Sequence, residues 1–145
     1  MDEPAAPVDS PALETVRDRA RTHSLVERTR VEQTGSTISM VVLSLSMDRY
    51  PDHLKDVRVE IQWYTNGDYN FHYVEQHQSE TIWQCRWDRH PNPHTSRGHF
   101  HPPPEAKSSA AIADQPTDRH PSAMFTRTLA NVRDRIADLW AGSDR

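Results

Sequence analysis

The sequence predicts an α+β fold, in which an antiparallel β-meander of about five strands has an N-terminal and a C-terminal helix packed on one face. Apolar and polar residues alternate in DVRVEIQWY, residues 56–64, which indicates a strand with one buried face. Asn66-Gly67, a strong tight-turn signal, separates this run from the alternating YNFHYV. Apolar residues near the C-terminus recur at steps of three and four, as in an amphipathic helix.

The N-terminal segment MDEPAAPVDS is acidic and rich in proline, and we expect residues 1–10 to be a disordered extension. Residues 11–145 then form a single α+β domain. Ser10 is a capping residue in front of Pro11, which predicts a helix over about 11–22.

Two further runs, STISMVVLSLSM (36–47) and TIWQCRW (81–87), are expected to be strands, the first because it is rich in β-branched and apolar residues. LVERTRVEQT (25–34) could continue the preceding helix or form a strand, and a strand is favoured because Gly35 and the run STISMVVLSLSM follow it at once. The segment KSSAAIADQPTDRHPS, residues 107–122, is small and polar and is expected to be a loop. The closing helix follows it, ends near Trp140 and has its apolar side formed by Phe125, Leu129, Val132, Ile136 and Leu139.

Composition excludes several classes of protein. The net charge of −4 argues against a general nucleic-acid coat, although a local basic patch can still bind phosphate. The single cysteine, Cys85, allows no internal disulfide and no cysteine-based zinc site, and its tryptophan neighbours indicate a buried thiol. No apolar run approaches the roughly 18 residues of a membrane span, and the N-terminus does not resemble a signal peptide. We therefore expect a cytoplasmic protein without membrane contact.

The stretch RHPNPHTSRGHFHPPP, residues 89–104, contains the highest density of histidines, which are candidates for catalysis or metal binding. If HFH is extended, His99 and His101 point to one side and Phe100 points to the other, into the core. The preceding strand brings Asp88 and His90 to the same edge of the sheet.

These residues suit three different roles. The first is metal-independent RNA cleavage, with His99 and His101 as acid and base, Arg97 or Arg89 on the phosphate, and Asp88 orienting His90 or His99. The second is a metal site, because HxH is a common ligand spacing that His90 or Asp88 could complete. The third has no chemistry: the histidines are solvated or bind the backbone around them. In addition to the histidines, Tyr64 is singled out. It lies opposite the apolar face of its strand and is the aromatic residue expected to meet a ligand. No cofactor is expected.

The order of these elements resembles the TumE toxin family of toxin–antitoxin systems. The similarity covers most of residues 25–113 and the closing helix, from LVERTRVEQTGSTISMVVLSLS through DVRVEIQWYTNGDYNFHYV. Its most specific part is WD-x-H followed by GHFHPPP, which here gives Trp87, Asp88, His90, Gly98, His99 and His101. The insertion PNPHTSR and the N-terminal extension depart from the family pattern.

The resemblance implies a small intracellular toxin whose cognate antitoxin has a helix-turn-helix DNA-binding domain, and it favours RNA as the substrate. The roles given to individual histidines are inferred from the motif positions of this sequence. Two alternatives remain open at this stage. One is a non-catalytic protein-binding module, and the other is a metal-dependent hydrolase that uses the HxH segment.

Overall fold

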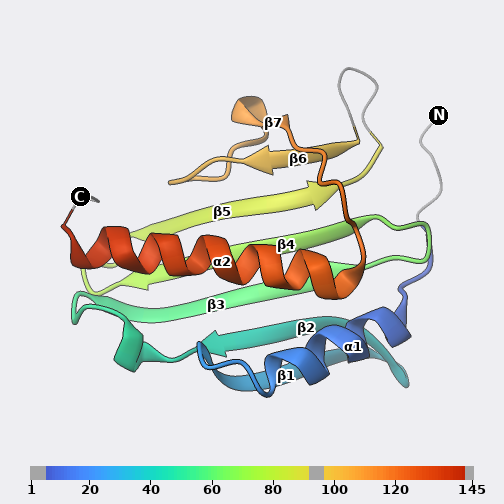
Figure 1. The fold of residues 1–145 in the computed structure, drawn as a ribbon, viewed down its shortest axis with the longest axis horizontal. Helices are drawn as coiled ribbons and strands as arrows, with labels where there is room; N and C mark the ends of the chain where they lie inside the picture. Colours follow the sequence, from blue (N-terminus) through green and yellow to red (C-terminus); the bar gives the residue numbers. More distant parts are fainter. Residues whose placement is uncertain (1–5, 92–96, 143–145) are drawn as a thin grey trace.

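The computed structural model describes residues 6–91 and 97–142, which form two helices and one sheet (Figure 1). The helices are α1 (Ser10–Ala20) and α2 (Pro121–Trp140). The strands are β1 (Val26–Thr34), β2 (Thr37–Leu45), β3 (Leu54–Trp63), β4 (Tyr69–His77), β5 (Ile82–Arg89), β6 (Gly98–His101) and β7 (Ile112–Ala113).

The strands lie in the sheet in chain order, from β1 to β7, and every neighbouring pair is antiparallel. The predicted meander and the α+β class are therefore confirmed. The expected number of about five strands is too low because GHFH pairs with the end of β5 and Ile112–Ala113 pairs with β6. The two residues of β7 lie in the segment that was expected to be a loop.

Both helices lie on the same face of the sheet, as Figure 1 shows and as predicted. The alternating apolar residues of β3 are buried beneath them, and those of β4 continue the same core. The helices contribute the buried residues Leu13, Val16, Ala20, Met124, Phe125, Leu129, Val132 and Leu139. No helix in the described part of the chain is long and apolar enough to cross a membrane.

The start of α1 differs in detail from the prediction. Asp9, not Ser10, caps the helix, and its carboxylate accepts a hydrogen bond from the Ala12 amide at 3.1 Å. The Ser10 hydroxyl instead donates to the carbonyl of Ile38 in β2. Asp9 also donates its amide to the carbonyl of Trp63, so the end of the N-terminal extension is attached to β3. Residues 1–5 lie outside the described part of the chain.

A buried ion pair connects α2 to the sheet. Glu75 of β4 is fully buried, and its two carboxylate oxygens accept hydrogen bonds from Arg135 of α2 at 2.6 and 2.7 Å. The Tyr73 hydroxyl donates to the same carboxylate at 2.7 Å, and His77 Nε2 lies 2.9 Å from it. The Arg135 guanidinium stacks 3.4 Å from the Trp83 ring. We call Tyr73, Glu75, His77 and Arg135 the Glu75 network.

Candidate functional site

The sheet face opposite the helices collects the polar residues of β5 and β6. Asp88 pairs with His99 and Arg86 pairs with His101 in the antiparallel register. Directly paired residues of neighbouring strands point to the same face, so all four side chains gather there. The prediction that HFH is extended is confirmed. Phe100 lies on the other face, where its ring packs 5.3 Å from Trp87, next to the core as expected.

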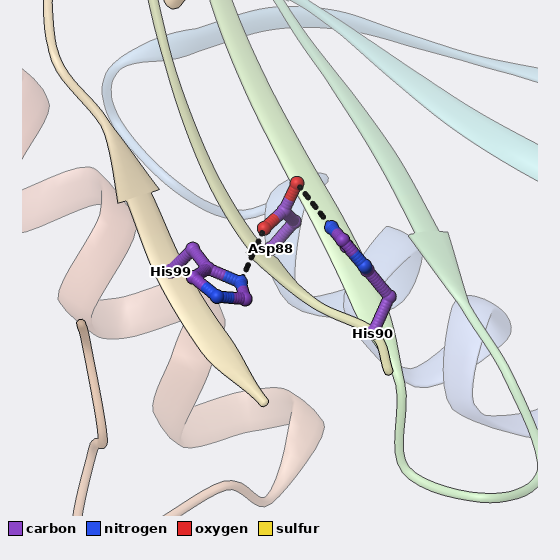
Figure 2. A group of neighbouring side chains, drawn as sticks. All are labelled: Asp88, His90 and His99. Carbon is purple, nitrogen blue, oxygen red and sulfur yellow. Dashed lines mark ion pairs between the residues drawn. The ribbon is translucent and has the colours of Figure 1, made fainter. Parts of the chain in front are cut away.

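Asp88 is the centre of this group, and Figure 2 shows it between His90 and His99. His101 Nε2 lies 2.9 Å from Asp88 Oδ2, and the same oxygen forms ion pairs with Arg86 Nε at 3.2 Å and His90 Nε2 at 3.6 Å. The other oxygen, Oδ1, is 3.7 Å from His99 Nδ1. We call these five residues the Asp88 cluster. One carboxylate thus brings together three of the histidines that sequence analysis singled out.

The members of the Asp88 cluster differ in their access to solvent. Asp88, His99 and His101 are buried, whereas half of the His90 side chain is exposed. The chain after β6 returns along β5, where the Gln84 amide donates to the Pro104 carbonyl. Burial lowers the pKa of His101, and the charge of Asp88 opposes this shift only in part. This direction favours the neutral imidazole, whose Nε2 lies 2.9 Å from the carboxylate.

A cleft of about 450 Å³ opens on this face beside the cluster. His90, Asp88 and Arg86 line it, together with Tyr64, the aromatic residue that was expected to meet a ligand. His99 and His101 are not among its lining residues. Of the three histidines predicted to be catalytic, His90 is the one that lines the cleft, so a molecule bound there can touch it.

Arg97 and Arg89, the expected phosphate contacts, both bind Asp68. Arg97 donates from Nε and Nη2 to the two Asp68 oxygens at 2.8 and 2.9 Å, and Arg89 donates to Oδ1 at 2.8 Å. These interactions lower the pKa of the Asp68 carboxyl against the opposing effect of its burial. The cation beside the histidines is Arg86, which sequence reasoning missed. Arg86 is two residues before Asp88 on the same strand, and side chains two residues apart on a strand point to the same face. This alternation is the sequence signal that could have identified Arg86.

Asp88, His90 and His99 also fit a three-ligand metal site. Each offers one ligand atom, and these atoms lie within 4.8 Å of one another. One carboxylate and two imidazoles form a ligand set that zinc accepts. However, the Arg86 guanidinium lies at the same carboxylate, and its charge opposes a cation there. The insertion residue His94 lies outside the described part of the chain.

Among protein-family models, the one described as Toxin TumE matches this chain over residues 13–137. Searches of curated proteins and of solved structures returned no match. The matched region includes most of α1, all seven strands and most of α2, together with every member of the Asp88 cluster. The family is one of toxins, which act opposite a cognate antitoxin. The match extends over most of the sequence, and the chain therefore belongs to the TumE toxin family.

Proposed function

We propose that this toxin acts on RNA in the cytoplasm, as a metal-independent endoribonuclease that uses histidine acid/base chemistry. The observation that carries the proposal is the placement of His90. It is the exposed imidazole of the Asp88 cluster, it lines the cleft, and a buried carboxylate lies behind it. An imidazole suits this role because both of its protonation states are accessible near neutral pH.

In the proposed reaction His90 accepts the proton of a ribose 2′-hydroxyl. The 2′-oxygen then forms a bond to the adjacent phosphorus, and the bond from phosphorus to the 5′-oxygen breaks. His90 returns the proton to this leaving oxygen, so that the products are a 2′,3′-cyclic phosphate and a 5′-hydroxyl. Arg86 stabilises the negative charge that develops on the phosphorane oxygens. Because His90 first accepts one proton and then returns it, a single exposed histidine is enough for both proton transfers.

His99 and His101, the pair expected to be acid and base, act in this proposal by positioning Asp88. Their burial keeps them from the substrate, but both contact the carboxylate that orients His90. The His90 and His99 rings are 5.3 Å apart, so replacing His99 removes a neighbour of the reacting imidazole. In this arrangement Asp88 is shared between two buried histidines, His99 and His101, and the exposed His90.

The cognate antitoxin is proposed to be a helix-turn-helix DNA-binding protein, as the family resemblance implies. Finding a small open reading frame of this type directly beside the gene would support that assignment. Co-purification of the two chains tests it directly. A stable partner together with no RNA cleavage at any pH would instead favour the non-catalytic binding module.

The test compares the wild-type chain, expressed without its antitoxin, with the His90→Ala variant. We expect a loss of RNA cleavage of at least about 100-fold, in line with the usual contribution of general acid/base catalysis. His53→Ala is the matched control, since His53 is exposed and lies beside the opposite end of β4. Equal cleavage by wild type and His90→Ala would refute the assignment.

A metal-dependent hydrolase is the second candidate, favoured by the ligand spacing of Asp88, His90 and His99. Chelation separates the two mechanisms. We expect full cleavage after dialysis against a chelator, with products that end in a cyclic phosphate. Activity that is lost on chelation and restored by zinc would establish the metal mechanism instead.

A further inference from the structure

A second cleft, of about 380 Å³, lies beyond the end of β5 and next to the segment that precedes α2. Its wall includes Arg89, Arg97 and Arg119, together with Tyr69 and Asp114. Arg89 and Tyr69 also line the cleft that contains His90. The two clefts are therefore neighbours that share a wall. We call the second one the arginine pocket.

The arginine pocket has an excess of positive charge. Asp68 is a single carboxylate that pairs with both Arg89 and Arg97. Asp114 pairs with Arg127 at 2.6 Å, so its charge is already compensated. Arg119 is exposed and forms no hydrogen bond or ion pair among those found in the described part of the chain. Burial, followed by the charge of Arg119, lowers the pKa of Arg89, and the charge of Asp68 opposes this shift only in part. A bound anion relieves this repulsion.

Tyr69 supplies an independent sign of a ligand. Its side chain is 2 % exposed, and its hydroxyl has no hydrogen-bond partner among the described residues. Burial raises the pKa of Tyr69 to about 12, so the hydroxyl is protonated and can donate. Buried hydroxyls are nearly always hydrogen-bonded, and an unsatisfied one needs an explanation. An acceptor oxygen in the pocket would provide the missing partner.

We propose that the arginine pocket binds a backbone phosphate of the RNA strand, next to the phosphate that reacts at His90. This assignment rests on the proposed function, because it takes the strand in the first cleft to be RNA. Planar guanidinium groups bind phosphate oxygens bidentately, and Arg119 and Arg89 are placed to do so at the pocket wall. The shared wall makes Arg89 the point where the strand passes from one cleft to the other. The role is one of positioning, because a phosphate fixed here sets the register of the strand over His90.

The experiment measures binding and not cleavage. A 2′-O-methyl oligoribonucleotide has no free 2′-hydroxyl to react, so its affinity can be followed by fluorescence anisotropy at several salt concentrations. For single strands the slope of log affinity against log salt changes by about 0.7 per neutralised phosphate. We expect Arg119→Gln to reduce the slope by about 0.7. Arg28→Gln is the matched control, because Arg28 is exposed on β1 at the opposite edge of the sheet, and it should leave the slope unchanged.

Tyr69→Phe provides a second variant that keeps the aromatic ring and removes only the hydroxyl. We expect affinity for the same oligonucleotide to fall about tenfold, the effect of losing one hydrogen bond to a charged group. The salt slope should remain that of the wild type, because no charge is changed. Unchanged affinity would contradict the role given to this hydroxyl.

The outcomes separate this proposal from the proposed function. Cleavage of unmodified RNA by the wild type, with equal salt slopes for wild type and Arg119→Gln, overturns the pocket assignment alone. A reduced slope without any cleavage supports the pocket as an RNA phosphate site and overturns the catalytic assignment. Tight binding of pyrophosphate, with no binding of the oligonucleotide, overturns RNA as the occupant and points to a small free phosphate.

Discussion

Replacing Arg135 by methionine should reveal how much the Glu75 network contributes to stability. The variant retains most of the apolar stem but removes the guanidinium that makes two hydrogen bonds to Glu75. Glu75 has no exposed surface, so water cannot replace the lost cation without rearrangement of α2. Among the described residues, the buried carboxylate then keeps the Tyr73 hydroxyl and His77 as partners.

The expected cost follows from this burial. Removing one partner of a buried ion pair costs about 3–5 kcal/mol, because the other charge stays desolvated. For a chain of this size that corresponds to a fall in melting temperature of roughly 10–15 °C. By comparison, an exposed charge is worth about 0.5 kcal/mol or less. Arg133→Met is thus a control on the same helix, since Arg133 is exposed.

Urea unfolding followed by tryptophan fluorescence measures these differences, and Trp83 reports directly because Arg135 stacks on its ring. The double variant Glu75→Leu/Arg135→Met removes both charges, and we expect it to be more stable than Arg135→Met alone. A loss below about 1 kcal/mol for Arg135→Met, equal to that of Arg133→Met, would refute the reasoning.

Three further predictions concern other parts of the fold. Gly98→Ala would place a Cβ against the Asp114 carbonyl, a backbone group that cannot give way. We expect this variant to lose about 1–3 kcal/mol of stability in urea unfolding. Unchanged stability would show that the two backbone segments can separate. Burial and the charge of Arg133 lower the pKa of His23, so the unfolded state binds more protons and stability should fall as pH drops through about 6.5. His23→Gln should flatten this dependence in unfolding curves between pH 5 and 8, and an unaltered pH profile would contradict it. Burial raises the pKa of the Cys85 thiol to about 12, so iodoacetamide at pH 8 should alkylate the urea-unfolded chain but not the native one, as mass spectrometry would show.

Much of the fold is predictable because its elements depend on local pattern. The alternation in β3 gives a strand whose apolar side is buried, and Asn66-Gly67 gives the tight turn before β4, with Gly67 at a φ of 85°. β7 could not be predicted in the same way. It has two residues, both exposed, and it exists because they pair with β6 and not because of any pattern of their own.

The candidate site likewise has some features that local sequence pattern predicts and others that depend on contacts between distant residues. The period of two in β5 and β6 is enough to place Asp88, His99 and His101 on one face, and the structure does so. The burial of these histidines is not local, since it depends on the return of the chain after β6 along β5. Likewise, Arg97 binds Asp68, a residue 29 positions earlier in the chain, and no spacing in the sequence indicates that pairing.

The two acidic centres of the sheet differ in a way that separates a structural role from a catalytic one. Glu75 and Asp88 are both buried, and each contacts an arginine and at least one histidine. Glu75 lies beneath α2, and Arg135 saturates both of its oxygens. Asp88 faces the side without helices, its Oδ1 has no hydrogen-bond partner among the described residues, and its neighbour His90 opens onto a cleft. A carboxylate that is fully satisfied stabilises the fold, whereas one that retains hydrogen-bonding capacity can still orient an imidazole toward a substrate, and this difference supports our proposal that the chemistry takes place at Asp88.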